Sequence, residues 1–398
     1  MKTPSLAVPG FRAAGVRCGI KTRGPDVALI VSDVPAAAAG VFTRSTVVGA
    51  PVTVSRERVR RGRARAIVAN AGVSNVAMGA RGLRDARRMT ELAARAVGCR
   101  AEEVLVASTG VIGHPLPMDK LTRGIADAGR SLEPGGLDAA SRAILTTDLV
   151  QKTAAVRTKI DGRSVSIAGI AKGSGMIEPD VATMLSFLVT DAAIAPPLLR
   201  RLLRGAADAS YNRLTVDGES STSDTVLLLA NGVAGHAPLR DAASAGARRF
   251  AAALGEVTQE LARAIARDGE GATKLVTVKV GGARSAEEAA RAAKRIANSM
   301  LVKTALFGGD PNWGRILQTI GAARVAIRLE RAVVSLCGVA VFRAGAPTGV
   351  AARRRAGARL RAQEVEVALD LGAGRHAATV WTCDLSYDYV KINAEYTT

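Results

Sequence analysis

The sequence predicts an α+β protein in which mixed sheets are layered with helices. Segments with the periodicity or β-branched content of strands alternate with segments of helical periodicity along the whole chain. Several neighbouring strands are joined by turns too short to hold a helix, which favours hairpins over a strict βαβ succession. The 398 residues, 48% of them hydrophobic, suffice for two domains or one large layered body.

The expected elements follow a definite order. The first half should contain strands at 27–34, 64–71 and 101–110, helices at 81–98, 118–132 and 136–147, and a hairpin from 152 to 170 with Asp161-Gly162 as its type I′ turn. The second half should contain strands at 184–189, 224–232 and 274–282, helices at 196–211 and 245–267, and a helix to about 300 that opens with the capping-box pair Ser285 and Glu288. Short strands are expected from there to the C-terminus, apart from an Arg-rich helix near 346–362.

The chain is strongly basic, with 55 Lys and Arg against 35 Asp and Glu and a net charge of +20. A charge of that size makes nucleic acid the first partner to consider. Aromatic residues are only 3%, however, so few side chains could stack on bases. The basic clusters at 55–66 and 353–361 lie among alanines at helical spacing and are expected to be solvated helix faces. Nucleic acid is therefore not the expected partner.

Cysteine usage and hydropathy predict a cytoplasmic protein. Cys18, Cys99, Cys337 and Cys383 form no C-x-x-C pair, so neither a zinc ribbon nor a redox dithiol is expected, and reduced thiols fit best. Pro and Gly interrupt the N-terminal apolar stretch, which therefore fails as a signal peptide. No run of 18 uncharged apolar residues occurs, so we expect no membrane span.

The sequence lacks the motifs of several common nucleotide-binding and catalytic sites. The sequence has no Walker-type phosphate loop, no G-x-G-x-x-G after a strand and no G-x-S-x-G elbow. The three histidines, His114, His236 and His376, stand beside Pro, Ala or Gly and are expected to be surface residues. A fold can still bring an imidazole to a nucleophile, but these patterns favour a hydroxyl nucleophile that needs no histidine.

Thr183 is the candidate for such a nucleophile. In N-terminal-nucleophile chemistry a Ser, Thr or Cys attacks the carbonyl before it, the chain is cut, and the new α-amine acts as base beside the hydroxyl. Ala182-Thr183 offers a small acyl residue after the loop glycines Gly173 and Gly175 and before the apolar strand MLSFLV. An Ala-Thr step that merely opens a core strand would look the same.

Several long motifs of this sequence resemble the motifs of one protein family. GIAKGSGMIEPDVATMLSFLVTDA (169–192) resembles the autoprocessing segment of the ornithine acetyltransferase family, also called glutamate N-acetyltransferase or ArgJ, of arginine biosynthesis. Further matches follow in the family's order over nearly the whole chain: VFTRS (41–45), VLVASTGVIG (104–113), AILTTD (143–148), STSDTVLLLANG (221–232), RDGEGATKL (267–275), SMLVKTALFGGDPNWGRI (299–316) and DLSYDYVKINAEYTT (384–398).

The resemblance implies a layered α/β/β/α body that is cut between Ala182 and Thr183. The fragments 1–182 and 183–398 would then form one intertwined catalytic body. Thr183 would be the acetyl-accepting nucleophile, and Thr109 with Gly110 would form the oxyanion hole. Without the resemblance, Thr109-Gly110 reads as a plain strand exit. The substrate contacts implied in this way are Thr146, Lys172, Thr183, Glu270, Asn393 and Thr398.

The implied reaction moves acetyl from N2-acetyl-L-ornithine to L-glutamate through an acetyl-Thr183 intermediate. Lys172 can meet an α-carboxylate and Glu270 a cationic amine. Neither a coenzyme nor a metal is expected, although some members of the family also take acetyl from acetyl-CoA. The fragments are expected to pair into a heterotetramer of two α and two β fragments.

Two stretches depart from the usual family pattern, and three alternatives stay open. VANAGVSNVAMGARG (68–82) differs from the usual asparagine- and cysteine-containing version, and Glu178-Pro179-Asp180 looks like the form found in acetyltransferases of secondary metabolism. Donor and acceptor therefore stay open between arginine biosynthesis and secondary metabolism. A self-processed aminopeptidase or amidase would use the same nucleophile, and a basic nucleic-acid-binding protein is the alternative from another class.

Overall fold

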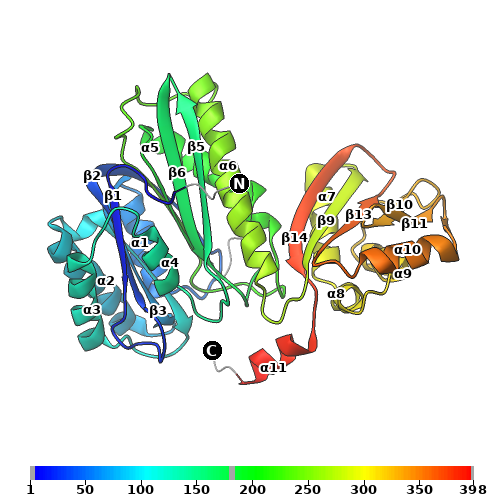
Figure 1. The fold of residues 1–398 in the computed structure, drawn as a ribbon, viewed down its shortest axis with the longest axis horizontal. Coiled ribbons are helices and arrows are strands. Elements are labelled where there is room, and N and C mark those ends of the chain that lie inside the picture. Colours follow the sequence, from blue (N-terminus) through cyan, green and yellow to red (C-terminus); the bar gives the residue numbers. More distant parts are fainter. Residues whose placement is uncertain (1–4, 179–183, 396–398) are drawn as a thin grey trace. The chain divides into compact units, whose positions relative to one another are not determined.

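The computed structural model describes residues 5–178 and 184–395, and the chain divides into two compact units (Figure 1). The first unit holds the described residues up to Asn212 together with Ser220–Leu261. The second holds Arg213–Glu219 and the described residues from Ala262 onward. Each unit has its own sheet.

The first unit is built on an eight-stranded mixed sheet. Its strands run in the order β4-β3-β2-β8-β7-β6-β5, with β1 beside β2. The pairs β3/β4 and β7/β8 are parallel and the other pairs are antiparallel. The strands are β1 (Phe11–Val16), β2 (Val27–Phe42), β3 (Arg63–Val73), β4 (Val104–Val111), β5 (Lys152–Ile160), β6 (Arg163–Lys172), β7 (Leu185–Thr190) and β8 (Thr225–Ala230).

The long strand β2 turns this sheet into two layers. Its first half pairs with β3 and its second half with β8, and the register shifts between Val31 and Ala36. Side chains from both halves, among them Ile67 of β3 and Phe187 of β7, share one core with α4 (Leu137–Ala143). A core that receives residues from both halves requires them to face each other.

Helices cover the outer faces of both layers. Three helices, α1 (Ala50–Val59), α2 (Gly79–Val97) and α3 (Met118–Arg130), lie at the β1–β4 side, where a second core joins them to the sheet (Figure 1). On the other side Val257 and Leu261 of α6 (Ala245–Arg267) pack over Gly169 of β6, and α5 (Pro196–Ala209) packs on β2. The predicted helix, sheet, sheet, helix layering is therefore confirmed.

The second unit has a six-stranded mixed sheet in the order β12-β11-β10-β13-β9-β14. Buried and exposed residues alternate along β9 and β13, so helices cover one face of this sheet. Its elements are β9 (Leu275–Ala283), α7 (Ala286–Ala297), α8 (Met300–Phe307), α9 (Trp313–Ala322), β10 (Val333–Leu336), β11 (Val339–Arg343), β12 (Ala346–Pro347), α10 (Val350–Arg359), β13 (Glu364–Asp370), β14 (His376–Cys383) and α11 (Tyr387–Glu395).

The expectation of mainly short strands after residue 300 is wrong, because α8, α9 and α11 are helices. The sequence MLVKTALF of α8 is too uniformly apolar to show a helical period. The missed signals are the N-caps: the side chains of Ser299 and Asn312 accept hydrogen bonds from backbone N–H groups three residues later.

At the predicted capping box, Ser285 accepts from the N–H of Glu288 at 3.1 Å, but the Glu288 carboxylate accepts from the N–H of Arg284 instead of that of Ser285.

Two further expectations need correction. His236 is buried and not a surface residue, since its Nε2 accepts from the N–H of Ala193 at 3.1 Å and its Nδ1 donates to the carbonyl of Ala237 at 2.8 Å. His114 and His376 are exposed as expected. The basic cluster 55–66 is not one helix face, because α1 ends at Val59 and residues from 63 onward belong to β3. The cluster 353–361 does follow the solvated face of α10 and the turn after it.

The described cysteines are all free thiols. In the part of the chain that the structure describes, no helix has both the length and the apolar composition needed to cross a bilayer.

Candidate active site

A buried polar cluster lies where β6 ends in the first unit. The Nζ of Lys172 donates to the hydroxyl of Thr146 at 2.7 Å and lies 3.8 Å from a carboxylate oxygen of Asp148. Only 4% of the Lys172 side chain is exposed. The structure thus brings together two of the predicted substrate contacts, Lys172 and Thr146, and adds Asp148, which sequence reasoning left without a role.

Asp148 is the centre of this cluster. It accepts hydrogen bonds from the Nζ of Lys152 and the N–H of Gly173, both at 2.6 Å, and from the N–H of Thr146 at 3.0 Å. Burial alone would raise the pKa of this carboxyl, but Lys172 and Lys152 outweigh it and hold the pKa well below the usual 3.8. Asp148 is therefore a fixed negative charge that holds the cation of Lys172 in place.

Sheet register brings this cluster to the strand of the predicted nucleophile. Lys172 of β6 stands opposite Leu185 of β7, which lies two residues after Thr183 in the chain. The predicted cleavage site at Ala182 and Thr183, like Pro179, Asp180 and Thr398, lies outside the described residues. Lys172 is thus placed one strand away from the first described residues that follow the predicted nucleophile.

Asp224 is a further buried group beside this strand. Its Oδ1 accepts a 2.7 Å hydrogen bond from the N–H of Met184. Its Oδ2 is buried and has no hydrogen-bond partner among the described residues, and the hydroxyl of Thr43 nearby donates to the carbonyl of Ser221 instead, at 2.6 Å. Burial raises the pKa of Asp224 well above 3.8, against the opposing effect of the Met184 N–H and the charge of Lys172.

The predicted oxyanion-hole residues lie at the end of β4. Gly110 stands opposite Gly72 of β3 in the parallel ladder, and their φ angles are +129° and +108°. A Cβ on Gly110 would lie 2.3 Å from the carbonyl carbon of Gly72, so no other residue fits this approach. Because β4 is the edge strand of its sheet, alternate N–H groups face away from the ladder, and that of Val106 donates to the hydroxyl of Ser55 at 2.7 Å.

Lys21 connects the end of the sheet at Gly72 and Gly110 to the Lys172 cluster. A Cβ on Gly72 would meet the side chains of Ile20 and Lys21 at 2.8 and 3.2 Å. The Nζ of Lys21 donates to the carbonyl of Leu145 at 2.8 Å, next to Thr146. Four backbone N–H groups of residues 18–21 donate to the carboxylate of Asp26 and fix this loop. No sequence signal marks Lys21, because its place depends on the folding of a loop over two distant segments.

The remaining predicted contacts lie in the second unit. The side-chain amide of Asn393, on α11, donates to the Glu270 carboxylate at 2.9 Å, so the structure brings these two predicted contacts together. Glu270 is 9% exposed. The loop that follows Glu270 is packed against the start of α11, since Ser386 donates to the carbonyl of Gly271 at 2.5 Å and a Cβ on Gly271 would lie 2.4 Å from the N of Tyr389.

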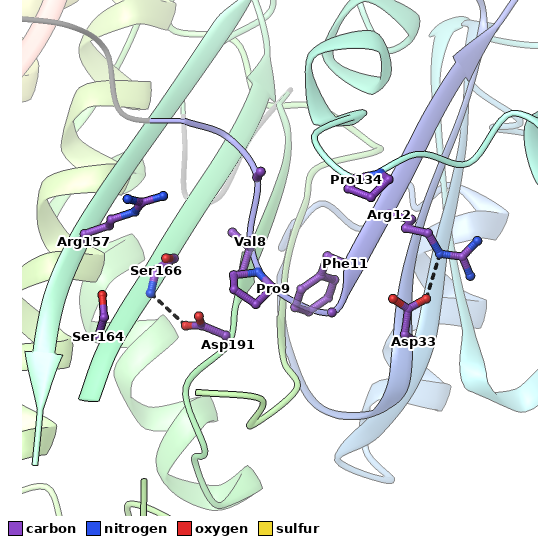
Figure 2. A pocket seen from close by; sticks show the side chains of 12 residues that line it. Val8, Pro9, Phe11, Arg12, Asp33, Pro134, Arg157, Ser164, Ser166 and Asp191 are labelled. Carbon is purple, nitrogen blue, oxygen red and sulfur yellow. Dashed lines mark hydrogen bonds and ion pairs between the residues drawn. The ribbon is translucent and has the colours of Figure 1, made fainter. Parts of the chain in front are cut away.

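A hollow of about 430 Å³, drawn in Figure 2, lies elsewhere in the first unit. Its lining comes from the N-terminal segment around Phe11 and from β6. Asp191 accepts there from the N–H of Ser166 at 2.8 Å, and Arg12 pairs with Asp33 at 2.8 Å (Figure 2). Among the predicted catalytic and substrate-binding residues that the structure describes, none lines this hollow.

Known proteins resemble this chain over its full length. The ArgJ family model matches residues 12–398. The arginine biosynthesis bifunctional protein ArgJ of Symbiobacterium thermophilum is 51% identical over 98% of both chains, and that of Geobacter sulfurreducens is 48% identical over 99% of this chain and 100% of its own. The crystal structure of arginine biosynthesis bifunctional protein ArgJ from Bacillus halodurans, 41% identical, superposes with a TM-score of 0.52 over 54% of this chain and 100% of that one. The chain therefore belongs to the ArgJ family, the ornithine acetyltransferase family whose motifs it carries in order.

Proposed function

We propose that the chain cuts itself between Ala182 and Thr183 and then moves acetyl from N2-acetyl-L-ornithine to L-glutamate. As a member of its family the protein is an acyltransferase of arginine biosynthesis. The Thr183 hydroxyl attacks the acetyl carbonyl, its proton passes to the Thr183 α-amine, and the C–N bond of the donor breaks as ornithine leaves with a proton. The α-amine of glutamate then attacks the ester and regenerates the hydroxyl.

The observation that carries this proposal is the Lys172 cluster beside the strand that follows Thr183. A buried ammonium group held by Asp148 and Thr146 suits an α-carboxylate, which donor and acceptor share. In the transition state, the Thr109-Gly110 end of β4 would supply the donors for the oxyanion. Glu270 with Asn393 would bind the ornithine side-chain cation. Thr398, which the resemblance assigns to the substrate, completes the proposed contact set.

We extend the proposal to the state of the protein in the cell. The exchange between N2-acetyl-L-ornithine and L-glutamate needs no coenzyme, because Thr183 itself carries the acetyl group from donor to acceptor. The cut fragments stay together, since the sequence of the expected second fragment supplies β7 and β8 in the middle of the first unit's sheet. Two such pairs of fragments form a heterotetramer in the cytoplasm. Family membership alone supports this part of the proposal.

Acetyl transfer with and without glutamate tests the reaction. The purified protein is given N2-acetyl-L-ornithine with a carbon-13 label in the acetyl group, and labelled N-acetylglutamate and acetate are measured. The proposal predicts labelled N-acetylglutamate as the main product and slow acetate release without glutamate. Acetate as the main product with glutamate present would indicate an amidase, and transfer only to acceptors other than glutamate would indicate a secondary-metabolism enzyme.

The basic surface gives the nucleic-acid alternative its own test. Binding through phosphate contacts falls steeply with salt, by about 10³ to 10⁵ between 50 and 200 mM for six to ten contacts. The proposal predicts only weak, sequence-independent retention of a labelled duplex at 200 mM salt. Tight, sequence-dependent binding at that salt would favour the alternative.

A further inference from the structure

The hollow drawn in Figure 2 contains a buried carboxylate that lacks a cationic partner. Its volume is about 430 Å³, and its lining residues all belong to the first unit. Asp191 directly follows β7 and is only 2% exposed. Its Oδ1 accepts from the N–H of Ser166 at 2.8 Å, but no side chain of another described residue donates to this carboxylate or forms an ion pair with it. We call this cavity the Asp191 hollow.

A buried charge without a counter-ion is unfavourable, and the titration of Asp191 reflects this. Burial raises the pKa of Asp191 above the usual 3.8, although the N–H of Ser166 and the positive charge of Arg157 oppose the effect. A cation that enters the hollow and binds this carboxylate would supply the missing opposite charge. The carboxylate therefore suits the ammonium group of a ligand.

Sheet register places a guanidinium group beside this carboxylate. Arg157 of β5 stands opposite Ser166 of β6 in an antiparallel pair, so their side chains share one face of the sheet. Arg157 is exposed, lines the hollow and makes no hydrogen bond or ion pair with any other residue that the structure describes. Figure 2 shows Arg157, Ser164, Ser166 and Asp191 grouped on one side of the hollow. A carboxylate and a guanidinium that are not joined to each other can hold the ammonium and the carboxylate of one α-amino acid.

The wall next to this charged side is apolar. Three residues of the N-terminal segment form it: Val8, Pro9 and Phe11 (Figure 2). Beyond them Arg12 and Asp33 neutralise each other in an ion pair of 2.8 Å. Apolar walls with a few placed polar groups are typical of small-molecule sites. This wall suits an apolar ligand side chain better than the second charge of ornithine or glutamate.

The Asp191 hollow is distinct from the candidate active site. Lys172 stands opposite Leu185 at the start of β7, whereas Asp191 follows the end of that strand. Six residues separate Leu185 from Asp191, which is about 20 Å at roughly 3.3 Å per residue of extended chain. A small ligand in the hollow therefore does not reach the Lys172 cluster.

We propose that the Asp191 hollow binds a free α-amino acid with an apolar side chain. The Asp191 carboxylate accepts from the ligand's ammonium group, with the Ser166 hydroxyl beside it. Arg157 donates to the ligand's carboxylate, and the ligand's side chain packs on the apolar wall. The inference goes beyond the proposed function and does not depend on it, because no step of acetyl transfer uses the hollow.

Equilibrium dialysis of the purified full-length protein against radiolabelled L-leucine measures this binding. Two analogues remove one charged group each: N-acetyl-L-leucine lacks the ammonium group and L-leucinamide lacks the carboxylate. Each analogue should compete more weakly than unlabelled L-leucine, N-acetyl-L-leucine by at least about tenfold, because a charge-assisted hydrogen bond is lost. L-Serine should also compete at least about tenfold more weakly, since it buries little apolar surface. N-Acetyl-L-glutamate, which the proposed function places at the Lys172 cluster, should not displace leucine.

Two variants assign the two charged contacts. Asp191→Asn keeps an oxygen for the Ser166 N–H and should bind L-leucine at least about tenfold more weakly, with little change for N-acetyl-L-leucine. Arg157→Gln should bind L-leucine about threefold more weakly, because its guanidinium is exposed, with little change for L-leucinamide. Lys159→Gln removes an exposed charge from the same strand that does not line the hollow, and it should bind as wild type does.

Three results would overturn the proposal. One is the absence of saturable leucine binding in the wild-type protein. Another is equal leucine binding by Arg157→Gln and Lys159→Gln, a comparison that holds even if the buried Asp191→Asn variant fails to fold. The third is displacement of leucine by N-acetyl-L-glutamate, which would place the amino acid in the candidate active site. None of these measurements uses acetyl transfer, so failure of the proposed reaction would leave the assignment of the hollow unchanged.

Discussion

The carboxyl group of Asp224 accepts a 2.7 Å hydrogen bond from the backbone N–H of Met184, the residue that follows the proposed nucleophile. Asp224 directly precedes β8, and Met184 directly precedes β7, which pairs with β8 in parallel. A buried acid therefore fixes the point at which the chain leaves the proposed cleavage site.

Removing this acceptor should destabilise the protein and impair processing. In Asp224→Ala the Met184 N–H stays buried without a partner, which costs about 1 to 3 kcal/mol in the free energy of unfolding. Asp224→Asn keeps a carbonyl oxygen that can accept the Met184 hydrogen bond, so it should cut and fold nearly as wild type does. Urea unfolding and gel analysis of the fragments check both variants. If the Asp224→Ala and Asp224→Asn variants were cleaved equally and were equally stable, the hydrogen bond from the Met184 N–H to Asp224 would have no role.

The Asp148 cluster predicts a loss of stability in acid. The pKa of Asp148 in the folded protein lies below its ordinary value of 3.8, so its stabilising effect is present above pH 3.8 and is lost as the pH falls through the folded pKa. Asp148→Asn leaves the fully buried ammonium of Lys152 without its anion and should be strongly destabilised at neutral pH. The difference in unfolding free energy between wild type and Asp148→Asn should therefore stay constant from pH 7 to about pH 5 and shrink as the pH falls from about 4 toward 2. A difference that stays constant over this lower range would contradict the role of Asp148.

Gly110 and Gly113 offer a matched pair of substitutions. Both have positive φ angles, +129° and +80°, but a Cβ on Gly113 meets nothing within 4 Å, whereas one on Gly110 collides with the Gly72 backbone. Gly113→Ala should cost about 1 to 2 kcal/mol for the left-handed conformation and stay active. Gly110→Ala should lose transfer activity and melt at a clearly lower temperature, because β3 and β4 must separate there. Thermal melting and acetyl-transfer rates distinguish the two, and an active, stable Gly110→Ala would remove this strand end from the oxyanion hole.

The C-terminus should matter although chain ends are usually dispensable. Deleting Glu395–Thr398 removes one proposed substrate contact and leaves the Asn393 to Glu270 hydrogen bond in place. We expect kcat/KM for acetyl transfer to fall at least about tenfold, with little change in melting temperature, since surface changes alter stability by roughly 0.5 kcal/mol or less. Lys391→Gln, on the same helix and exposed, is the control. Unchanged kinetics in the deletion would exclude these last residues from substrate binding.

Sequence periodicity predicted much of the fold because most elements have one apolar face. Most strands and helices from β2 to α7 follow from such patterns, but β1, α1 and the second half of β2 were not predicted. The helix α8 was missed because its sequence is too uniformly apolar to show a helical period, whereas α9 buries Ile316, Thr319 and Ile320 at helical spacing and could have been predicted. The caps at Ser299 and Asn312 were the better signal for both helices. His236 looked like a loop residue and is buried, because a tight backbone environment can satisfy both ring nitrogens.

The candidate site was predictable only where motifs carried it. Lys172 with Thr146 and Glu270 with Asn393 were named from the resemblance, and each pair is in hydrogen-bond contact. Asp148, Lys21 and Asp224 were not given roles, although two of them stand inside motifs. Their importance depends on cross-strand register and on burial, which place a charge beside residues far away in the sequence. Neither property can be read from a single chain's pattern.

Denaturing mass spectrometry of the purified protein tests the central claim most directly. The account predicts two polypeptides, residues 1–182 and 183–398, and an added acetyl group on the second after incubation with N2-acetyl-L-ornithine in the absence of glutamate. Thr183→Ala should remain one uncut chain without an acetyl group, and Thr183→Ser, which loses the methyl group that restricts the rotamer, should cut slowly. A fully active wild-type protein that remains a single 41.0 kDa chain would contradict the account, because an uncut Thr183 has no free α-amine to act as its base.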